Sequence, residues 1–521
     1  MNPNFGSPAV NLVQQEPKQA YLNLTSARYW VVGIGCVLFV AAFPIFRLYW
    51  SNQNTKFLHG LAKAFPDRLG VDWTAGTVDG LPVFSSLVFM VAQFSNTLMF
   101  YAIEFGLLAA LFWALFFIGC KMARRSGASL HFQICLMATL VLLASLNLRH
   151  GVLDGVAGQS LVGGYLQPAE FGVFFIAALA LELGGYYSAA ILLAAAPAAL
   201  HAGYVIPSII TSGCILASGY SQRRRWPPII VLLIAACLIV IPQIDLAIRF
   251  APTDRRTFEE AAHILAFERI PHHSDPSRWL GKTAYIKSAL GVVAIYLLPR
   301  GAIRLALCVL LAWAVAGTIF VLMTGNPELA LIAPWRTSVI TVSVSIAVIS
   351  AWLIDFIIAR TGDVKLRNLY AGVFAALALY AAGAGIIKKV SLYEAERPEY
   401  VSFIKTHHSP EDIYITDPSD EEFRLAAMTA QFASWKSHPY RDIEVLEWYK
   451  RVAYAKAVFN SPAALASTPA IDCAALRKLL EDYKVTHLLA KETHTQSACG
   501  FLDSVFSGKD ATIFRVNNSA L

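Results

Sequence analysis

Eleven apolar stretches alternate with polar segments from residue 29 to residue 390, and a mostly polar segment follows them. A bilayer core about 30 Å thick needs roughly 20 apolar residues per helix, so this pattern predicts a mainly α-helical, polytopic membrane protein. The expected spans are 29–48, 98–120, 131–148, 169–183, 185–200, 203–220, 228–248, 283–299, 303–323, 335–357 and 369–390. Between 169 and 220 the stretches are short and rich in Ala and Gly, so broken or re-entrant helices are an alternative there.

The polar segment 391–521 predicts a small α/β domain. Runs typical of strands occur at 412–416, 485–490 and 511–516. Helical spacing occurs at 423–432, 441–458 and 473–483. The chain is therefore expected to have three parts, namely a cytoplasmic tail (1–28), a membrane-spanning bundle (29–390) and a soluble C-terminal domain (391–521).

Composition and charge add an orientation. Hydrophobic residues make up 56% of the chain and charged residues 15%, which is typical of a membrane protein. When the stretches are counted alternately, four basic loops fall on one side: Lys121, Arg124 and Arg125; Arg223, Arg224 and Arg225; Arg300 and Arg304; Arg360, Lys365 and Arg367. The positive-inside rule makes that side cytoplasmic, so we expect a cytoplasmic N-terminus and a periplasmic C-terminal domain in a bacterial inner membrane. Lys388 and Lys389 argue weakly for the opposite orientation.

The net charge of +7 comes mostly from these loops. No basic run interleaved with aromatic residues occurs in a soluble segment, so the sequence does not indicate a nucleic-acid partner.

Of the eight cysteines, only Cys473 and Cys499 lie in the polar tail. Two cysteines in an extracytoplasmic domain predict a disulfide. The other six lie in or beside apolar stretches, where cysteine usually packs as a small apolar residue.

Three outer loops, at 49–97, 249–282 and 324–336, are long enough to build a site, and a shorter loop lies near Asp154. Together with the soluble domain they predict a roofed cavity at one face of the membrane. Charged groups at the mouth of a helix bundle are costly unless they are paired or functional. Glu104 and Glu182, inside apolar runs, are secondary candidates on the same ground.

Several short motifs in these loops resemble a bacterial multi-pass membrane family, and the whole layout resembles the GT-C superfamily of polytopic membrane glycosyltransferases. The motifs are Asn52-Gln53, Asp72-Trp73, Arg269-Ile-Pro-His272-His273, Pro334-Trp335-Arg336 and Trp435-Lys436-Ser-His-Pro. The resemblance spans nearly the whole chain. It implies that a sugar moves from a polyprenyl-phosphate-linked donor to an extracytoplasmic glycan or lipid acceptor.

The resemblance also suggests which residues act. In GT-C enzymes an acidic residue of the first outer loop deprotonates or orients the acceptor, and here Asn52-Gln53 replaces the acidic pair often found just after the first span. Because an amide cannot act as a base, Asp72 becomes the first candidate, with Asp67 and Asp79 in reserve. A turn or helix-cap role is the alternative for Asp72.

His272 and His273 are candidates for proton relay, phosphate contact or metal binding, or they are ordinary loop residues beside Pro271. The candidate substrate-binding residues are Asn52, Gln53, His59, Trp73, Arg269, Trp335 and Arg336. Arg269 and Arg336 suit a phosphate because the guanidinium fork matches its oxygens. Interfacial anchoring is the alternative for Trp335 and Arg336.

We therefore expect a GT-C-type glycosyltransferase whose partners are a polyprenyl-linked donor, membrane lipid and an acceptor. No cofactor is certain, and a divalent metal ion is an open alternative. The rival interpretations are a transporter or flippase and a non-catalytic membrane subunit, which the Asn52-Gln53 pair keeps open.

Overall fold

The computed structural model describes residues 26–123, 129–223, 226–459, 471–491 and 499–517. Most of the expected cytoplasmic tail, and basic residues 124–125 and 224–225, lie outside these ranges. Within them, seven helical segments are long and apolar enough to cross a membrane. These segments contain α6 (Leu98–Met122), α7 (Leu130–His150), α11 (Val205–Arg223), α12 (Ile229–Arg249), α17 (Ala302–Thr324), α19 (Ser338–Arg360) and α20 (Val364–Glu394).

The other four expected spans are shorter helices: α1 (Ser26–Ala42), α8 (Val173–Leu183), α9 (Tyr187–Ala195) with α10 (Pro197–Leu200), and α16 (Lys282–Leu297). The 11 residues of α8 extend only about 16 Å at the α-helical rise. Seven crossings are thus supported among the described residues, while the total of eleven stays a prediction. The shortness of α8 and α9 fits the alternative of broken helices.

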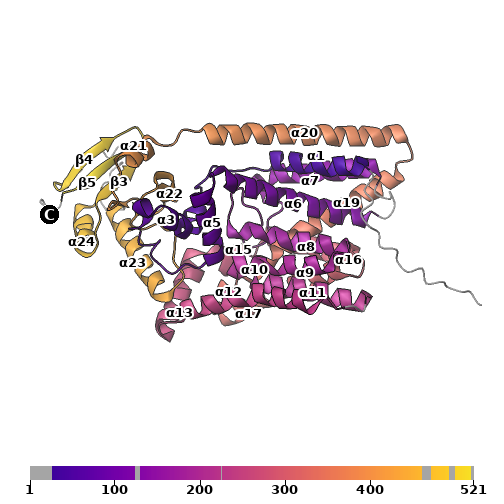
Figure 1. Ribbon diagram of the computed structural model, residues 1–521, viewed down its shortest axis with the longest axis horizontal. Helices are drawn as coiled ribbons and strands as arrows, with labels where there is room; N and C mark the ends of the chain where they lie inside the picture. Colours follow the sequence, from indigo (N-terminus) through magenta and orange to yellow (C-terminus); the bar gives the residue numbers. More distant parts are fainter. Residues whose placement is uncertain (1–25, 124–128, 224–225, 460–470, 492–498, 518–521) are drawn as a thin grey trace, which may run out of the picture.

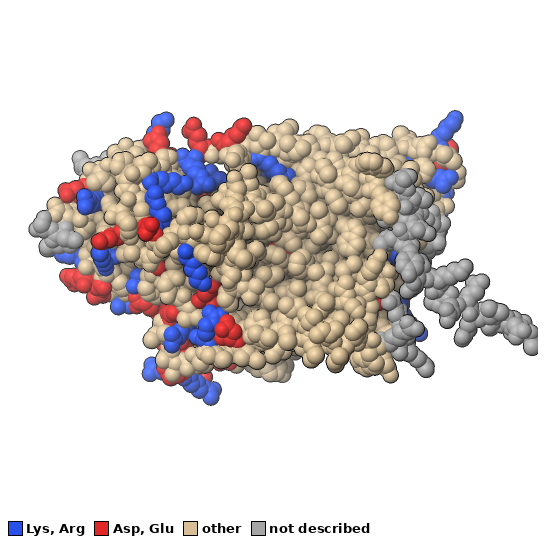
Figure 2. All heavy atoms as spheres, in the orientation of Figure 1, with Lys and Arg blue, Asp and Glu red and all other residues tan. Residues whose placement is uncertain are grey.

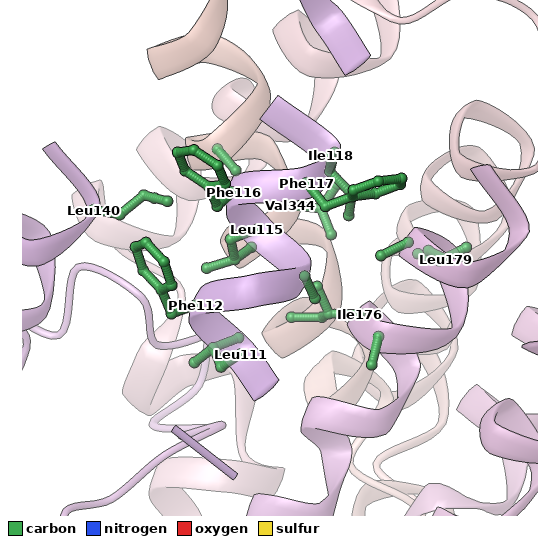
Figure 3. Close-up of a cluster of buried hydrophobic side chains, with 14 of the residues drawn as sticks. Leu111, Phe112, Leu115, Phe116, Phe117, Ile118, Leu140, Ile176, Leu179 and Val344 are labelled. Carbon is green, nitrogen blue, oxygen red and sulfur yellow. The ribbon is translucent and has the colours of Figure 1, made fainter. Parts of the chain in front are cut away.

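The helices of the bundle lie side by side, and their shared face is apolar (Figure 1). Figure 3 shows Phe112, Leu115 and Phe116 of α6 among side chains of α7, α8 and α19. On the face shown in Figure 2 the bundle carries few charges, whereas Lys, Arg, Asp and Glu gather at the end that carries the C-terminal domain. This uncharged belt is what a lipid environment requires.

Short helices fill the loops at the end of the bundle that faces the C-terminal domain. In the first loop they are α2 (Gln53–Lys56), α3 (Leu58–Ala64), α4 (Pro66–Leu69) and α5 (Pro82–Phe94). In the later loops they are η1 (Pro168–Gly172), η2 (Ala202–Tyr204), α13 (Arg255–His263), the π-helix η3 (Ile264–Arg269), α14 (Pro271–Ser274), α15 (Pro276–Trp279), α18 (Pro327–Leu331) and η4 (Pro334–Thr337).

The C-terminal domain is a five-stranded mixed sheet with helices, in the strand order β2-β1-β3-β5-β4. Its elements are α21 (Glu399–His407), β1 (Ile413–Ile415), α22 (Phe423–Ala427), β2 (Ala430–Gln431), α23 (Asp442–Phe459), α24 (Cys473–Asp482), β3 (His487–Lys491), β4 (Leu502–Ser507) and β5 (Ala511–Val516). A disulfide joins Cys473 and Cys499, the two cysteines of the tail.

One expected helix of this domain is partly wrong. The helix predicted over 423–432 ends at Ala427, because Met428 adopts a left-handed conformation (φ 52°) and the chain turns into β2. β2 then pairs in parallel with β1. This turn brings Gln431 and the segment behind it toward the first outer loop.

The domain and the outer loops share a hydrophobic core. Ala261, Ile264 and Leu265 of α13 and η3 pack with residues of α23, α24 and the sheet. The C-terminal domain is therefore seated on the loops of the bundle, and side chains at their boundary are held from both sides.

Candidate functional site

A cavity of about 900 Å³ lies where the bundle, the outer loops and the C-terminal domain meet. The cavity lies at the ends of the short helices. Its lining includes Gln167 and Ala169, just before α8, and His201 to Gly203, which follow α10 and begin η2. Its polar lining comes from distant parts of the chain: Asn52, Lys56, Gln159, Ser160, Tyr165, Gln167, His201, Gln243, Arg269, His272, His273, Arg336, Lys436, His438 and Tyr440.

The charge of this lining is one-sided. Four cationic side chains and four imidazoles face the cavity, and no Asp or Glu belongs to the lining among the described residues. Lys436 has an ion pair with Glu421 behind it, at 3.5 Å. Lys56, Arg269 and Arg336 have no carboxylate within 4.0 Å in the described part of the chain. Buried cations without a counter-charge are unfavourable, so the lining is suited to an anion.

Arg269 is the last residue of the π-helix η3 and is only 8% exposed. One guanidinium nitrogen, Nη2, donates to the Lys436 carbonyl at 2.8 Å, whereas Nε has no hydrogen-bond partner. Burial lowers the pKa of Arg269, although an arginine keeps its charge. The side chain is thus fixed by the C-terminal domain and keeps an unused donor.

Arg336 lies in η4. The residue before this helix, Ala333, adopts a left-handed conformation (φ 49°). Trp335 does not line the cavity. Its Nε1 donates to Thr318 Oγ1 at 2.6 Å and anchors η4 to α17. Arg336 is thereby directed toward η2, with Nη1 3.2 Å from His201 Nε2. A Cβ at residue 203 would lie 2.8 Å from Arg336 Nε, so Gly203 makes room for the guanidinium.

His272 and His273 are adjacent in α14 and both line the cavity, with ring centroids 4.0 Å apart. His273 Nδ1 lies 2.7 Å from the Ala157 carbonyl, which can only accept, so we assign the proton to Nδ1 and the lone pair to Nε2. The Gln159 amide, 3.0 Å from Nδ1, then presents its oxygen to this N–H. Burial, and then His272, lower the pKa of His273 to about 3. Burial, and then Arg269 and Lys436, lower the pKa of His272 as well. Both rings are neutral near pH 7.

The wall beside these histidines is formed by residues 151–167. We call residues 151–164 of it the wall loop. It contributes Gly158, Gln159, Ser160 and Gly163 to the lining. Sequence reasoning noted only Asp154 in this region. The signal available was its density of glycines, because Gly151, Gly158 and Gly164 have positive φ and let the chain fold back on itself.

The C-terminal domain supplies Lys436, His438 and Tyr440 in the segment between β2 and α23. Thr55 of α2 donates to Ser437 Oγ at 3.0 Å, which ties this segment to the first outer loop. Lys56 Nζ contacts the Tyr440 hydroxyl and lies 5.0 Å from the centroid of the Tyr440 ring. Burial, and then Arg269, lower the pKa of His438. The motif Trp435-Lys436-Ser-His-Pro therefore belongs to the cavity.

Asp72 and Trp73 lie at the boundary between loop and domain, not in the lining. The Asp72 carboxylate is buried, 2.8 Å from Arg424 Nε, and it accepts from the Gln431 backbone N–H at 3.0 Å. The Trp73 ring lies 4.3 Å from the Arg451 guanidinium. Both contacts fasten the C-terminal domain to the first outer loop, and the catalytic role expected for Asp72 stays a prediction.

Asn52 and Gln53 have different positions. Asn52 lines the cavity and donates to Gln167 Oε1 at 3.2 Å. Gln53 is fully buried and donates to the Leu166 carbonyl at 3.1 Å. The pair therefore connects the first outer loop to the cavity wall.

His59 and Asp79 border a small hollow of about 10 Å³ beside the cavity, roughly the room for one water. The hollow and the cavity share Thr55, Lys56, Gly80, Leu81, His438 and Tyr440. His59 Nδ1 lies 3.9 Å from Asp79 Oδ1, and Asp79 Oδ2 is buried without a hydrogen-bond partner. Burial lowers the pKa of His59. Asp79 thus offers a carboxylate beside the cavity, and one of its oxygens has no hydrogen-bond partner.

Metal binding finds little support in this lining. The described residues contain no group of three or more His, Cys, Asp or Glu placed to hold a metal ion. Mg²⁺ and Ca²⁺ prefer oxygen ligands such as carboxylates, and the cavity presents cations and imidazoles instead. The expected alternative of a divalent ion does not fit these residues.

One side of the cavity is apolar. Leu246, Ala247 and Phe250 at the end of α12, and Leu331 and Ile332 after α18, form this side. On α12 the neighbouring Ile244 and Ile248 are 54% and 72% exposed, as expected for a helix that faces lipid. The polar lining is therefore continuous with a surface that hydrocarbon chains can cover.

Comparison with protein-family models gives a match in the C-terminal domain. Residues 395–455 match a domain of unknown function, DUF6798. A search of curated proteins found no match to the chain. The matched segment contains Arg424, which pairs with Asp72, and Lys436, His438 and Tyr440 of the cavity. The match thus covers the part of the C-terminal domain that meets the membrane bundle.

Proposed function

We propose that the protein is a GT-C-type membrane glycosyltransferase that moves a sugar from a polyprenyl-phosphate-linked donor to an extracytoplasmic glycan or lipid acceptor. The observation that carries this proposal is the cavity at the end of the bundle, with cationic and imidazole side chains and no acidic lining among the described residues. The orientation predicted from the basic loops puts this cavity at the periplasmic face.

Arg269 and Arg336 are assigned to the carrier phosphate, with Lys56 and Lys436 as further cations. Charge-assisted hydrogen bonds from guanidinium to phosphate are among the strongest in proteins. A phosphate also offsets the cost of keeping Arg269 buried and Arg336 half-buried without a carboxylate. A neutral ligand would leave that cost in place.

The apolar side of the cavity supports a ligand with a hydrocarbon part. Phe250 lies on this side, directly after the exposed residues of α12, and Leu331 at the end of α18 also lines the cavity. A lipid chain there stays in contact with the bilayer while its phosphate reaches the cations. A soluble phosphate would gain nothing from this side.

Asp79 takes the role of base in this proposal, in place of Asp72. Its Oδ2 atom is buried and unpartnered beside the cavity, whereas the Asp72 carboxylate is occupied by Arg424 and the Gln431 amide. A base must have a lone pair within reach of the acceptor hydroxyl. His272 and His273 shape the site, and His273 Nε2 is a further acceptor.

A transporter or flippase is the second candidate, and one observation favours it. The helices α8 and α9 are short, and transporters often bind substrates beside broken helices. In addition, the carboxyl groups of Glu104 and Glu170 are buried and hydrogen-bond each other. A non-catalytic subunit is the third, and it would bind the anion without transfer. Flux of a phosphate-bearing lipid across vesicles, without sugar transfer, would support the transporter.

The test is a glycan analysis of a deletion strain. Surface polysaccharides and lipids are compared by mass spectrometry after rescue with wild type, Asp79→Asn, Arg336→Gln and, as a matched control, Asp67→Asn. Asp67 is an exposed acid of the same loop. We expect wild type and Asp67→Asn to restore a missing sugar and the other two variants to fail at equal expression. An unchanged glycan profile in the deletion strain would overturn the transferase proposal.

A further inference from the structure

We propose that Lys287 of α16 is a positioning residue that fixes the wall loop and, through it, the ring of His273. Nothing in its sequence context marks Lys287, which lies in an apolar helix away from the cavity lining. The contacts of Lys287 do not depend on any ligand. Their role in ligand binding rests on the proposed anion site.

Lys287 directs its ammonium at three backbone carbonyls of the wall loop. Nζ lies 2.9 Å from Gly151 O, 2.8 Å from Asp154 O and 3.0 Å from Gly155 O. An ammonium has three N–H donors, so all three are used. Gly151 is also the C-cap of α7, where the helix dipole favours a cation. A replacement for Lys287 would need a positive charge and a side chain of similar length.

The wall loop is held together around these contacts. Gly155 N–H donates to Gln159 O at 2.7 Å, and Ser160 Oγ donates to Asp154 Oδ1 at 2.9 Å. From α19, Ser338 Oγ accepts from Val156 N–H at 2.7 Å. Lys287 and Ser338 thus hold the loop from two helices, and only the Lys287 contact brings a charge.

The wall loop in turn fixes His273. The Ala157 carbonyl accepts from His273 Nδ1 at 2.7 Å, and the Gln159 amide group lies 3.0 Å from the same nitrogen. Ala157 has a left-handed conformation (φ 56°), which an alanine adopts only when its surroundings impose it. Lys287 holds the backbone just before this residue, at Gly151, Asp154 and Gly155, and so supports the strained carbonyl against the ring.

The test uses full-length protein in lipid nanodiscs without ligand. Hydrogen exchange of the wall loop and the NMR titration of His273, assigned with His273→Asn, are compared for wild type, Lys287→Met, Lys287→Arg and the control Lys282→Met. Lys282 is an exposed lysine of the same helix. The groups that face His273 are His272, Arg269 and Arg336, and they are unchanged in all variants.

We expect Lys287→Met to raise the exchange rates of Val156 and Gln159 at least tenfold and to raise the His273 titration midpoint by about one unit, because a loosened wall admits water. Lys287→Arg keeps the charge and should change the exchange rates and the titration midpoint by less. Lys282→Met should change neither quantity. A lower melting temperature with unchanged exchange and titration would overturn the inference. If Lys287→Met does not fold, an unshifted Lys287→Arg protein would overturn it.

A second measurement separates this inference from the proposed function. Inorganic pyrophosphate is titrated into the same nanodiscs as an anion probe. If Lys287→Met shifts His273 and also weakens pyrophosphate at least tenfold, both stand. If His273 shifts but wild type does not bind pyrophosphate, the positioning role stands and the anion site fails.

Discussion

At the scale of single residues, the informative feature is the contrast between paired and unpaired charges. Asp72 and Arg424 neutralise each other in full burial, at 2.8 Å. Arg269 is also buried and Arg336 is half-buried, and both face a cavity without acids in the described chain. A buried pair satisfies itself and is therefore structural, while an unpaired buried cation points to a ligand. Where the outer loops meet the C-terminal domain, the paired charges thus hold the fold together, and the unpaired cations are available to a ligand.

The contrast predicts different outcomes for two aspartates of the first loop. Asp72→Asn leaves Arg424 buried and unpaired, so it should destabilise the protein by about 3–5 kcal/mol. Asp79→Asn removes a carboxylate that has one unused oxygen, so it should abolish rescue of the glycan defect and leave the melting temperature near the wild-type value. Thermal unfolding in detergent measures the stability of both variants, and the glycan analysis measures the rescue. A well-folded Asp72→Asn protein would contradict the structural role of the pair.

The histidines of the cavity predict a pH dependence of stability. Their folded-state pKa values lie below that of a free histidine, and His273 reaches about 3. Between pH 6.5 and about 3 the unfolded chain thus binds more protons than the folded protein, so ligand-free stability falls as the pH falls through this window. His273→Asn should flatten this slope, measured by chemical unfolding at pH 7.5 and 5.5. His131 of α7, which is not part of the cavity lining, supplies the control variant, His131→Asn.

At the scale of elements, the wall loop depends on glycine. Gly158 has φ +64°, and an added Cβ would lie 3.3 Å from His273 Cε1 and 3.4 Å from His272 Cδ2. Gly158→Ala should therefore cost about 1–2 kcal/mol in backbone strain and weaken pyrophosphate about tenfold by displacing both rings. Gly106→Ala on α6 is the matched control, since nothing lies within 4 Å of its Cβ position. Equal affinity of the two variants would contradict the role of the wall loop.

Local sequence patterns predicted the long helices but not the assembly of the site. α6, α12 and α17 follow from uninterrupted apolar runs, because their length alone satisfies the bilayer. The motifs around Arg269, Arg336 and Lys436 indicated functional residues, and the structure brings them to one cavity. The sequence favours Asp72 over Asp79 as the base, and its catalytic role stays a prediction. No pattern in a sequence reveals a distant partner such as Arg424, which pairs with Asp72 in the structure.

Other features of the site depend on contacts that sequence periodicity does not encode. The wall loop has no helical or strand period, so its position depends on Lys287 and Ser338 from other helices. Helix α22 ends at Met428 through a left-handed residue, not at a proline or glycine. Such turns need tertiary contacts to form, and a propensity-based expectation continues the helix past them.

At the scale of the whole molecule, the charge distribution follows the long axis. The uncharged belt covers the bundle, and the charged end carries the C-terminal domain (Figure 2). Residues Arg300 and Arg304 border a hollow with Met122 at the end of α6, and α19 ends at Arg360. Basic residues of separate loops therefore gather at the end opposite the domain, which is the arrangement the positive-inside rule requires for a cytoplasmic face.

This arrangement predicts the side of the membrane on which the cavity opens. Ser402→Cys on α21 and Gly362→Cys between α19 and α20 each place one thiol at an exposed position at opposite ends of the molecule. In intact cells, a membrane-impermeant maleimide should label Ser402→Cys and leave Gly362→Cys unlabelled until the membrane is permeabilised. Wild type, whose cysteines outside the disulfide lie in the apolar bundle, gives the background. The reverse pattern would put the cavity in the cytoplasm, where a donor with an outward-facing phosphate could not reach Arg269 and Arg336.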